Sequence, residues 1–147
     1  MYTNILVPLD GSELAEGAIP YAQEIAQRSD ANLFLLQVMQ PVNIPTYYLQ
    51  AYDVIQEAHE EVNKSAENYL NTMAKTLEDD SLKVQTEVIR GIPQKEILAY
   101  IDRNKIDLIV LTARGQSGIT RWLIGSIANK ILKGARIPVL LIRPSTD

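Results

Sequence analysis

Residues 4–9 read NILVPL and residues 10–12 read DGS, and this stretch decides the fold class. An apolar run of this length without polar alternation is typical of a strand in a parallel sheet that is covered on both faces. Asp10 and Gly11 then indicate a turn, and Ser12 is placed to cap the helix whose apolar stripe begins at Leu14. Pro20 lies inside that helical pattern and is expected to kink it.

The same reading extends outward along the chain. Further apolar runs predict strands at Asn32–Met39, Lys83–Ile89, Leu108–Leu111 and Val139–Ile142. Helical patterns lie between them, including a long helix at Asp53–Glu78, one that starts near Pro93 and one that ends near Gly134. Alternating strands and helices form right-handed βαβ units, so the sequence predicts an α/β protein. Its sheet is expected to be open, doubly wound and parallel, with helices on both faces, in a single domain over residues 1–147.

Composition narrows the functional classes. The formal net charge of −4 argues against nucleic acid as the main partner. The chain has no cysteine and only one histidine, so neither thiolate nor histidine-rich metal sites are expected. The apolar runs are too short to cross a bilayer, and the chain opens without a basic segment followed by an apolar run. A cytoplasmic protein with no membrane partner is therefore expected.

A glycine-containing segment follows the fourth predicted strand. Residues 112–115 read TARG, nine residues follow Gly115, and Gly125-Ser126 then opens the last helix. Glycine lets backbone donors approach a phosphate, and free amides at a helix N-terminus attract anions. This pattern predicts that Gly115, Gly125, Ser126 and the amide of Ile127 hold phosphate groups. Arg114 and Arg121 are candidate partners for the phosphate charge.

The segment resembles the nucleotide loop of the universal stress protein family, which reads Gly, two residues, Gly, nine residues, Gly and Ser or Thr. The opening ILVPLDGS of residues 5–12 is similar to that family's first strand and its Pro-any-Asp turn, and residues 91–93 and 137–139 are also familiar. The resemblance covers nearly the whole chain. It implies a Rossmann-like fold, similar to that of the adenine nucleotide alpha hydrolases, with strand order 3-2-1-4-5. It also implies ATP as the ligand, with Mg²⁺ or Mn²⁺ bound only through the phosphates.

Site residues follow from the same resemblance. It implies that Pro8 and Asp10 lie near base and ribose, that the backbone of Val38 flanks the adenine, and that Leu111 and Thr112 line the sugar side. Two positions depart from the family pattern, and both belong to the implied site. Thr112 replaces the first loop glycine, and its branched side chain is expected to crowd the ribose. Ala128 stands where the best-matched ATP binders carry a hydroxyl.

Local alternatives stay open for these residues. The loop glycines also suit a plain turn, Ser126 also suits a plain N-cap, and Asp10 also suits a turn or capping residue.

Three functions compete on this evidence. An ATP-binding regulatory stress protein is favoured. A protein of the same fold that has lost nucleotide binding and acts through protein contacts is the alternative. A slow ATP hydrolase ranks last, because no lysine lies in the phosphate loop and no general base is placed by motif. Neither a Walker motif nor Gly-x-Gly-x-x-Gly occurs.

A homodimer is expected through the last strand. Residues 139–143 read VLLIR and are apolar on both alternating sets of side chains up to Ile142. The resemblance implies that this strand lies at the edge of the sheet, where an apolar strand risks aggregation unless another strand pairs with it. Two copies that meet antiparallel about a twofold axis satisfy both edges at once. Regulatory protein partners are expected but not identified.

Overall fold

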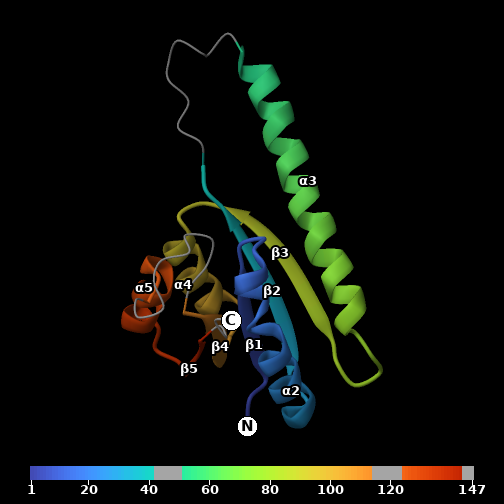
Figure 1. The fold of residues 1–147 in the computed structure, drawn as a ribbon, viewed down its shortest axis with the longest axis vertical. Coiled ribbons are helices and arrows are strands. Elements are labelled where there is room, and N and C mark those ends of the chain that lie inside the picture. The colour runs from blue at the N-terminus through green and yellow to red at the C-terminus, as the bar shows by residue number, and fades with distance from the viewer. Residues whose placement is uncertain (42–50, 114–123, 144–147) are drawn as a thin grey trace.

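A parallel five-stranded sheet forms the centre of the computed structural model, which describes residues 1–41, 51–113 and 124–143 (Figure 1). Its order is β3-β2-β1-β4-β5, as predicted. Every neighbouring pair of strands is parallel. The strands are β1 (Asn4–Leu9), β2 (Asn32–Met39), β3 (Val84–Arg90), β4 (Leu108–Thr112) and β5 (Val139–Ile142).

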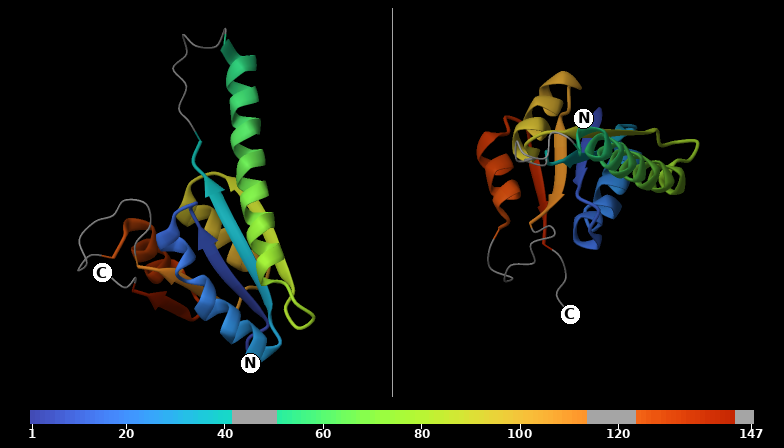
Figure 2. Two further views of the ribbon diagram at one scale, coloured as in Figure 1. Left: turned by 45° about the vertical axis from the view of Figure 1, so that its right-hand side comes forward. Right: turned by 90° about the horizontal axis from the view of Figure 1, so that it is seen from above.

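Helices cover both faces of this sheet, and the two further views show the layers (Figure 2). On one face lie α1 (Glu13–Glu16), α2 (Ile19–Ser29) and α3 (Tyr52–Leu77); on the other lie α4 (Pro93–Arg103) and α5 (Ser126–Gly134). The amino-terminal part of α3 extends beyond the sheet (Figure 1). No helix within the described ranges is both long and apolar enough to span a membrane.

The central strand β1 shows why the apolar run predicted a covered sheet. Ile5 and Val7 pack into the core beneath α1, α2 and α3, while Leu6 packs into the core beneath α4 and α5, and all three are fully buried. Burial of each such side chain contributes roughly 1.5–3 kcal/mol. A strand with apolar residues on both sides is therefore stable only between two helical layers.

The first helix differs from the prediction. We expected one helix kinked at Pro20, but the chain forms two: α1 ends at Glu16, and α2 begins at Ile19 with Pro20 in its first turn. The amide that proline lacks would have no intrahelical partner at that position, so a new helix start accommodates Pro20 at no cost. The predicted cap is confirmed, since Ser12 Oγ accepts a 3.2 Å hydrogen bond from the Ala15 amide.

Candidate functional site

A pocket of about 640 Å³ opens at the carboxyl ends of β1, β2 and β4, beside the first turns of α4 and α5. This is where the strand order reverses, and where doubly wound sheets bind ligands. Every predicted nucleotide-binding residue within the described ranges lines it. These residues are Pro8, Asp10, Val38, Leu111, Thr112, Gly125, Ser126, Ile127 and Ala128. The remaining predicted residues Gly115, Arg114 and Arg121 lie outside the described ranges.

The pocket also contains residues that the sequence reasoning missed. Gln37, Met39 and Gln40 come from the end of β2 and the residue after it, while Pro93 and Ile97 come from the first turns of α4. One signal was available for Gln37, which is a polar residue that interrupts the apolar run of β2 after Leu36. No comparable signal marks the α4 residues, because only the fold brings the start of α4 to this edge of the sheet.

Asp10 holds the turn between β1 and α1. Its Oδ1 accepts hydrogen bonds from the Ser12 amide at 2.9 Å and from Ser12 Oγ at 2.5 Å. Gly11 between them has a φ of +84°, a conformation that side chains disfavour. Asp10 is therefore a turn residue, as the local alternative predicted. The same residue also lies in the pocket wall.

The N-terminus of α5 forms another part of the pocket wall. Gly125 is the N-cap residue, its amide donates a 2.6 Å hydrogen bond to the Ala113 carbonyl, and no side-chain cap bond is formed within the described ranges. Ser126 is the first helical residue, so the reading of Ser126 as a plain N-cap is wrong. The first-turn amides and the helix dipole make this end of the pocket favourable for an anion.

Thr112, which departs from the family pattern, lies in the pocket wall beside the end of α1. Its side chain is 7% exposed and lines the pocket. Its methyl group lies 3.6 Å from the position that a Cβ would take at Gly17, the residue that ends α1. The methyl group therefore lies toward the end of α1, at a distance that a side chain at position 17 would also tolerate. Ala128, the other departure, is buried and packs into the core beneath α4 and α5.

Acidic groups gather beside the pocket on the α1 side. The Tyr69 hydroxyl on α3 bonds to Glu16 on α1. Burial raises the pKa of Tyr69 above its usual value, and the bond to Glu16 and the charges of Glu16 and Asp10 raise it further. Within the described ranges, no three acidic, histidine or cysteine side chains gather as a metal site would require. The negative charge here contrasts with the helix N-terminus at α5.

Together, the order of the sheet and the pocket at its switch point define a Rossmann-like α/β protein with a pocket at the strand ends. The sequence model of the Universal stress protein family matches residues 1–143. The chain belongs to the universal stress protein family.

Relatives and solved structures agree with this assignment. Universal stress protein MJ0531 of Methanocaldococcus jannaschii is 32% identical over 146 residues, which cover 97% of this chain and 83% of that protein. The structure of universal stress protein UspA from Lactobacillus plantarum is 33% identical, with a TM-score of 0.85 and coverage of 97% of this chain and 98% of that chain. A universal stress protein solved in complex with cAMP is 24% identical, with a TM-score of 0.66 and coverage of 98% and 99%.

Proposed function

We propose that this universal stress protein binds an adenine nucleotide, with ATP as the expected ligand, in the pocket at the ends of β1, β2 and β4. The observation that carries the proposal is that the predicted ligand residues meet in one pocket. Residues from four separate segments, which the loop pattern and the family resemblance predict as ligands, line the same cavity. In this role the protein is a regulatory nucleotide binder in the stress response, in the cytoplasm, and residues 1–147 act as one domain.

The pocket has the size and polarity that a nucleotide requires. Small-molecule sites commonly enclose about 300–1,000 Å³, and this cavity is about 640 Å³. Pro8, Val38 and Leu111 offer apolar surface for a base, while the amides at the start of α5 suit a phosphate. The related protein in complex with cAMP supports an adenine nucleotide as the ligand class.

A divalent cation is proposed to enter only with the nucleotide. Mg²⁺ is commonly held by one or two carboxylates together with substrate phosphates. Asp10 is the acidic residue among those that line the pocket, and its Oδ1 already accepts two hydrogen bonds from Ser12. The phosphates would therefore supply most of the ligands to the cation.

The deciding experiment is calorimetric titration of ATP, ADP and AMP into protein that has been unfolded, stripped of ligand and refolded. Gly125 has a φ of −57° and a ψ of 153°, which other residues also adopt, so a substitution there adds bulk without backbone strain. Gly125→Val should abolish ATP binding, and Gly125→Ala should weaken it less. Wild-type protein that binds none of the nucleotides would refute the proposal. A folded Gly125→Val protein with unchanged ATP affinity would refute this position of the phosphates.

We further propose that two copies form a homodimer through β5. This strand is an edge of the sheet, and all four of its apolar residues are only partly buried within one chain. The carbonyls of Pro138 and Ile142 accept hydrogen bonds from the β4 side, at 3.2 Å from Ile109 and 2.8 Å from Ala113. Since backbone groups alternate in direction along a strand, those of Val139 and Leu141 point away from β4. They are the groups that a second copy would pair with.

A further inference from the structure

Gln37 is a polar residue in the buried part of β2. It pairs in register with Leu9 of β1 and Val88 of β3. Leu35 and Leu33, two and four residues earlier on the same face of the strand, are fully buried. Gln37 is itself only 9% exposed, and it forms part of the pocket wall. A polar side chain at such a position is costly unless its hydrogen bonds are satisfied.

The carboxamide of Gln37 is poorly satisfied within the described ranges. Its Nε2 reaches only the thioether of Met39, at 3.6 Å, and thioethers are weak acceptors. Its Oε1 is buried and has no hydrogen-bond partner there. The orientation with Nε2 toward Met39 is the one that makes a hydrogen bond, because an amide oxygen placed there would face a sulfur that has no proton to donate.

The position of the carboxamide relates it to the turn that carries Asp10. A Cβ at Gly11 would lie 3.7 Å from Gln37 Nε2, so the carboxamide sits directly beside the β1–α1 turn. Gln37 lines the pocket, and its oxygen is buried. The terminal torsion of glutamine has a broad energy profile, and rotation about it can present the oxygen to the cavity.

A nucleotide would bring the missing donor from one of its two halves only. Ionised phosphate oxygens accept hydrogen bonds and do not donate them. The donors are the ribose hydroxyls and the exocyclic amino group of the base, both in the nucleoside half. An unpaired acceptor in the wall therefore selects for that half of the ligand.

We propose that Gln37 is a specificity-determining residue whose carboxamide turns to accept a hydrogen bond from the nucleoside half of the bound nucleotide. This inference rests on the proposed nucleotide site. The unpaired oxygen destabilises the free protein, and the ligand removes that penalty by supplying the donor. The residue thereby links ligand chemistry to the stability of the β2 end of the pocket.

The test uses Gln37→Met, which keeps the length of the side chain and removes both polar atoms. We expect the ATP dissociation constant to rise about tenfold, the effect of one lost buried hydrogen bond. The free variant should melt no lower than the wild type, because it buries no unpaired oxygen. Gln37→Leu is a second apolar variant in case Met packs poorly. Gln85→Met, on an exposed position of β3 outside the pocket, is the matched control and should bind ATP as the wild type does.

Two analogues identify the donor. 2′,3′-Dideoxy-ATP lacks both ribose hydroxyls, and ITP carries an oxo group in place of the amino group of adenine. Wild-type protein should bind one of them about tenfold more weakly than ATP, and Gln37→Met should bind that analogue and ATP equally well.

Two results would overturn the inference alone. One is equal ATP affinity of the wild type and Gln37→Met; the other is a variant that still binds that analogue as much more weakly than ATP as the wild type does. A free Gln37→Met protein that melts well below the wild type would also overturn it, by showing that the carboxamide is paired without ligand. Wild-type protein that binds no nucleotide refutes the proposed function and this inference with it, so the two failures are distinguishable.

Discussion

The hydroxyl of Tyr69 donates a 2.5 Å hydrogen bond to Oε1 of Glu16, across 53 residues of sequence. The bond joins α3 to α1, the short helix that continues from the Asp10 turn. It links the long helix to the helix that supplies Ala15 to the pocket wall. Its consequences can be measured, as can those of four other features of the molecule.

Tyr69→Phe removes this bond and leaves the ring in place. We expect the free energy of unfolding to fall by about 1 kcal/mol, the usual contribution of a partly buried hydrogen bond. Urea denaturation at neutral pH measures it. Tyr21→Phe, on the exposed side of α2, is the control and should change stability little. Equal stability of Tyr69→Phe and the wild type would contradict a stabilising role for this bond.

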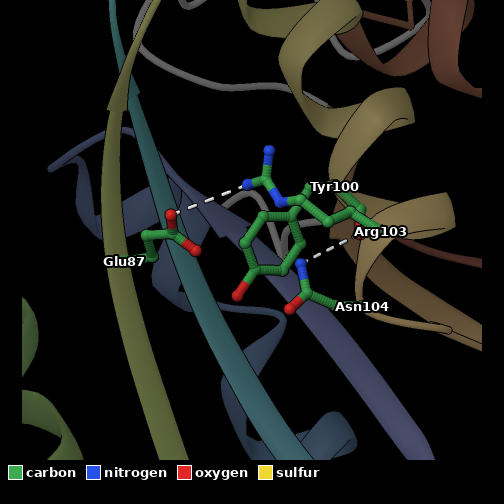
Figure 3. Close-up of polar contacts among 4 residues, drawn as sticks. All are labelled: Glu87, Tyr100, Arg103 and Asn104. Carbon is green, nitrogen blue, oxygen red and sulfur yellow. Dashed lines mark hydrogen bonds and ion pairs between the residues drawn. The ribbon is translucent and has the colours of Figure 1, made fainter.

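Tyr100 predicts a loss of stability at alkaline pH. Tyr100 is 2% exposed beside Glu87 of β3 and Arg103 of α4 (Figure 3). Burial and the nearby Glu87 carboxylate together raise the pKa of Tyr100 from 10.0 to about 12, although the charge of Arg103 opposes the rise. The unfolded chain then loses this proton at lower pH than the folded protein does. The stability that Tyr100 contributes is therefore fully present below about pH 10 and is lost between about pH 10 and 12.

Tyr100→Phe should reduce that alkaline decline and keep the edge-to-face contact with Phe34, whose ring centroid lies 6.3 Å away. Urea midpoints measured at about pH 9 and about pH 11 give the slope for each protein. Tyr69, whose pKa is also raised, contributes to the same decline, so the slope should shrink without disappearing. An identical slope in Tyr100→Phe and the wild type would contradict the assignment.

Gly11 predicts a backbone effect at the pocket. Its φ of +84° strains any residue with a side chain, so Gly11→Ala should cost about 1–2 kcal/mol of folding free energy. Gly11→Asn should cost less, since asparagine tolerates positive φ better. Thermal and urea unfolding of the pair give the comparison. A Gly11→Ala protein as stable as the wild type would show that the turn relaxes to another conformation.

Asp107 stabilises the end of the sheet that lies opposite the pocket. Its two carboxylate oxygens accept hydrogen bonds from the Thr3 and Asn4 amides, at 2.7 and 3.0 Å, and so hold the start of β1 beside the start of β4. Asp107→Ala should destabilise the protein by about 1–3 kcal/mol. The nucleotide affinity of the folded variant should not change. A large loss of affinity at full folding would contradict this separation of stability from binding.

Leu141 tests the proposed dimer. Its backbone amide points away from β4, so Leu141→Pro removes a donor that only a second copy would use, and an edge strand tolerates proline there. Light scattering should show a dimer for the wild type and a monomer for Leu141→Pro. Leu141→Ala, which keeps the amide, should stay a dimer or dissociate less. A wild-type monomer at micromolar concentration would refute the dimer.

Much of the fold could be predicted from the sequence because it depends on local interactions or on the periodicity of apolar residues. The run at residues 4–9 is apolar on both faces, and only a strand between two helical layers buries both. Ser12 caps α1 through a bond that spans three residues. The order of the strands and the residues around the pocket came from resemblance to the family, and the described part of each agrees with the structure.

Other features depend on packing between segments that are distant in sequence, and these only the tertiary structure decided. The split at Pro20 follows from where the chain turns onto the sheet. The contact of the Thr112 methyl group with the end of α1 and the unpaired oxygen of Gln37 are visible only when the neighbouring segments are in place. The outward direction of the Leu141 amide likewise follows from which backbone groups of β5 are hydrogen-bonded to β4. Sequence determines the periodic preferences of each segment, whereas the satisfaction of a buried polar atom is a property of everything around it.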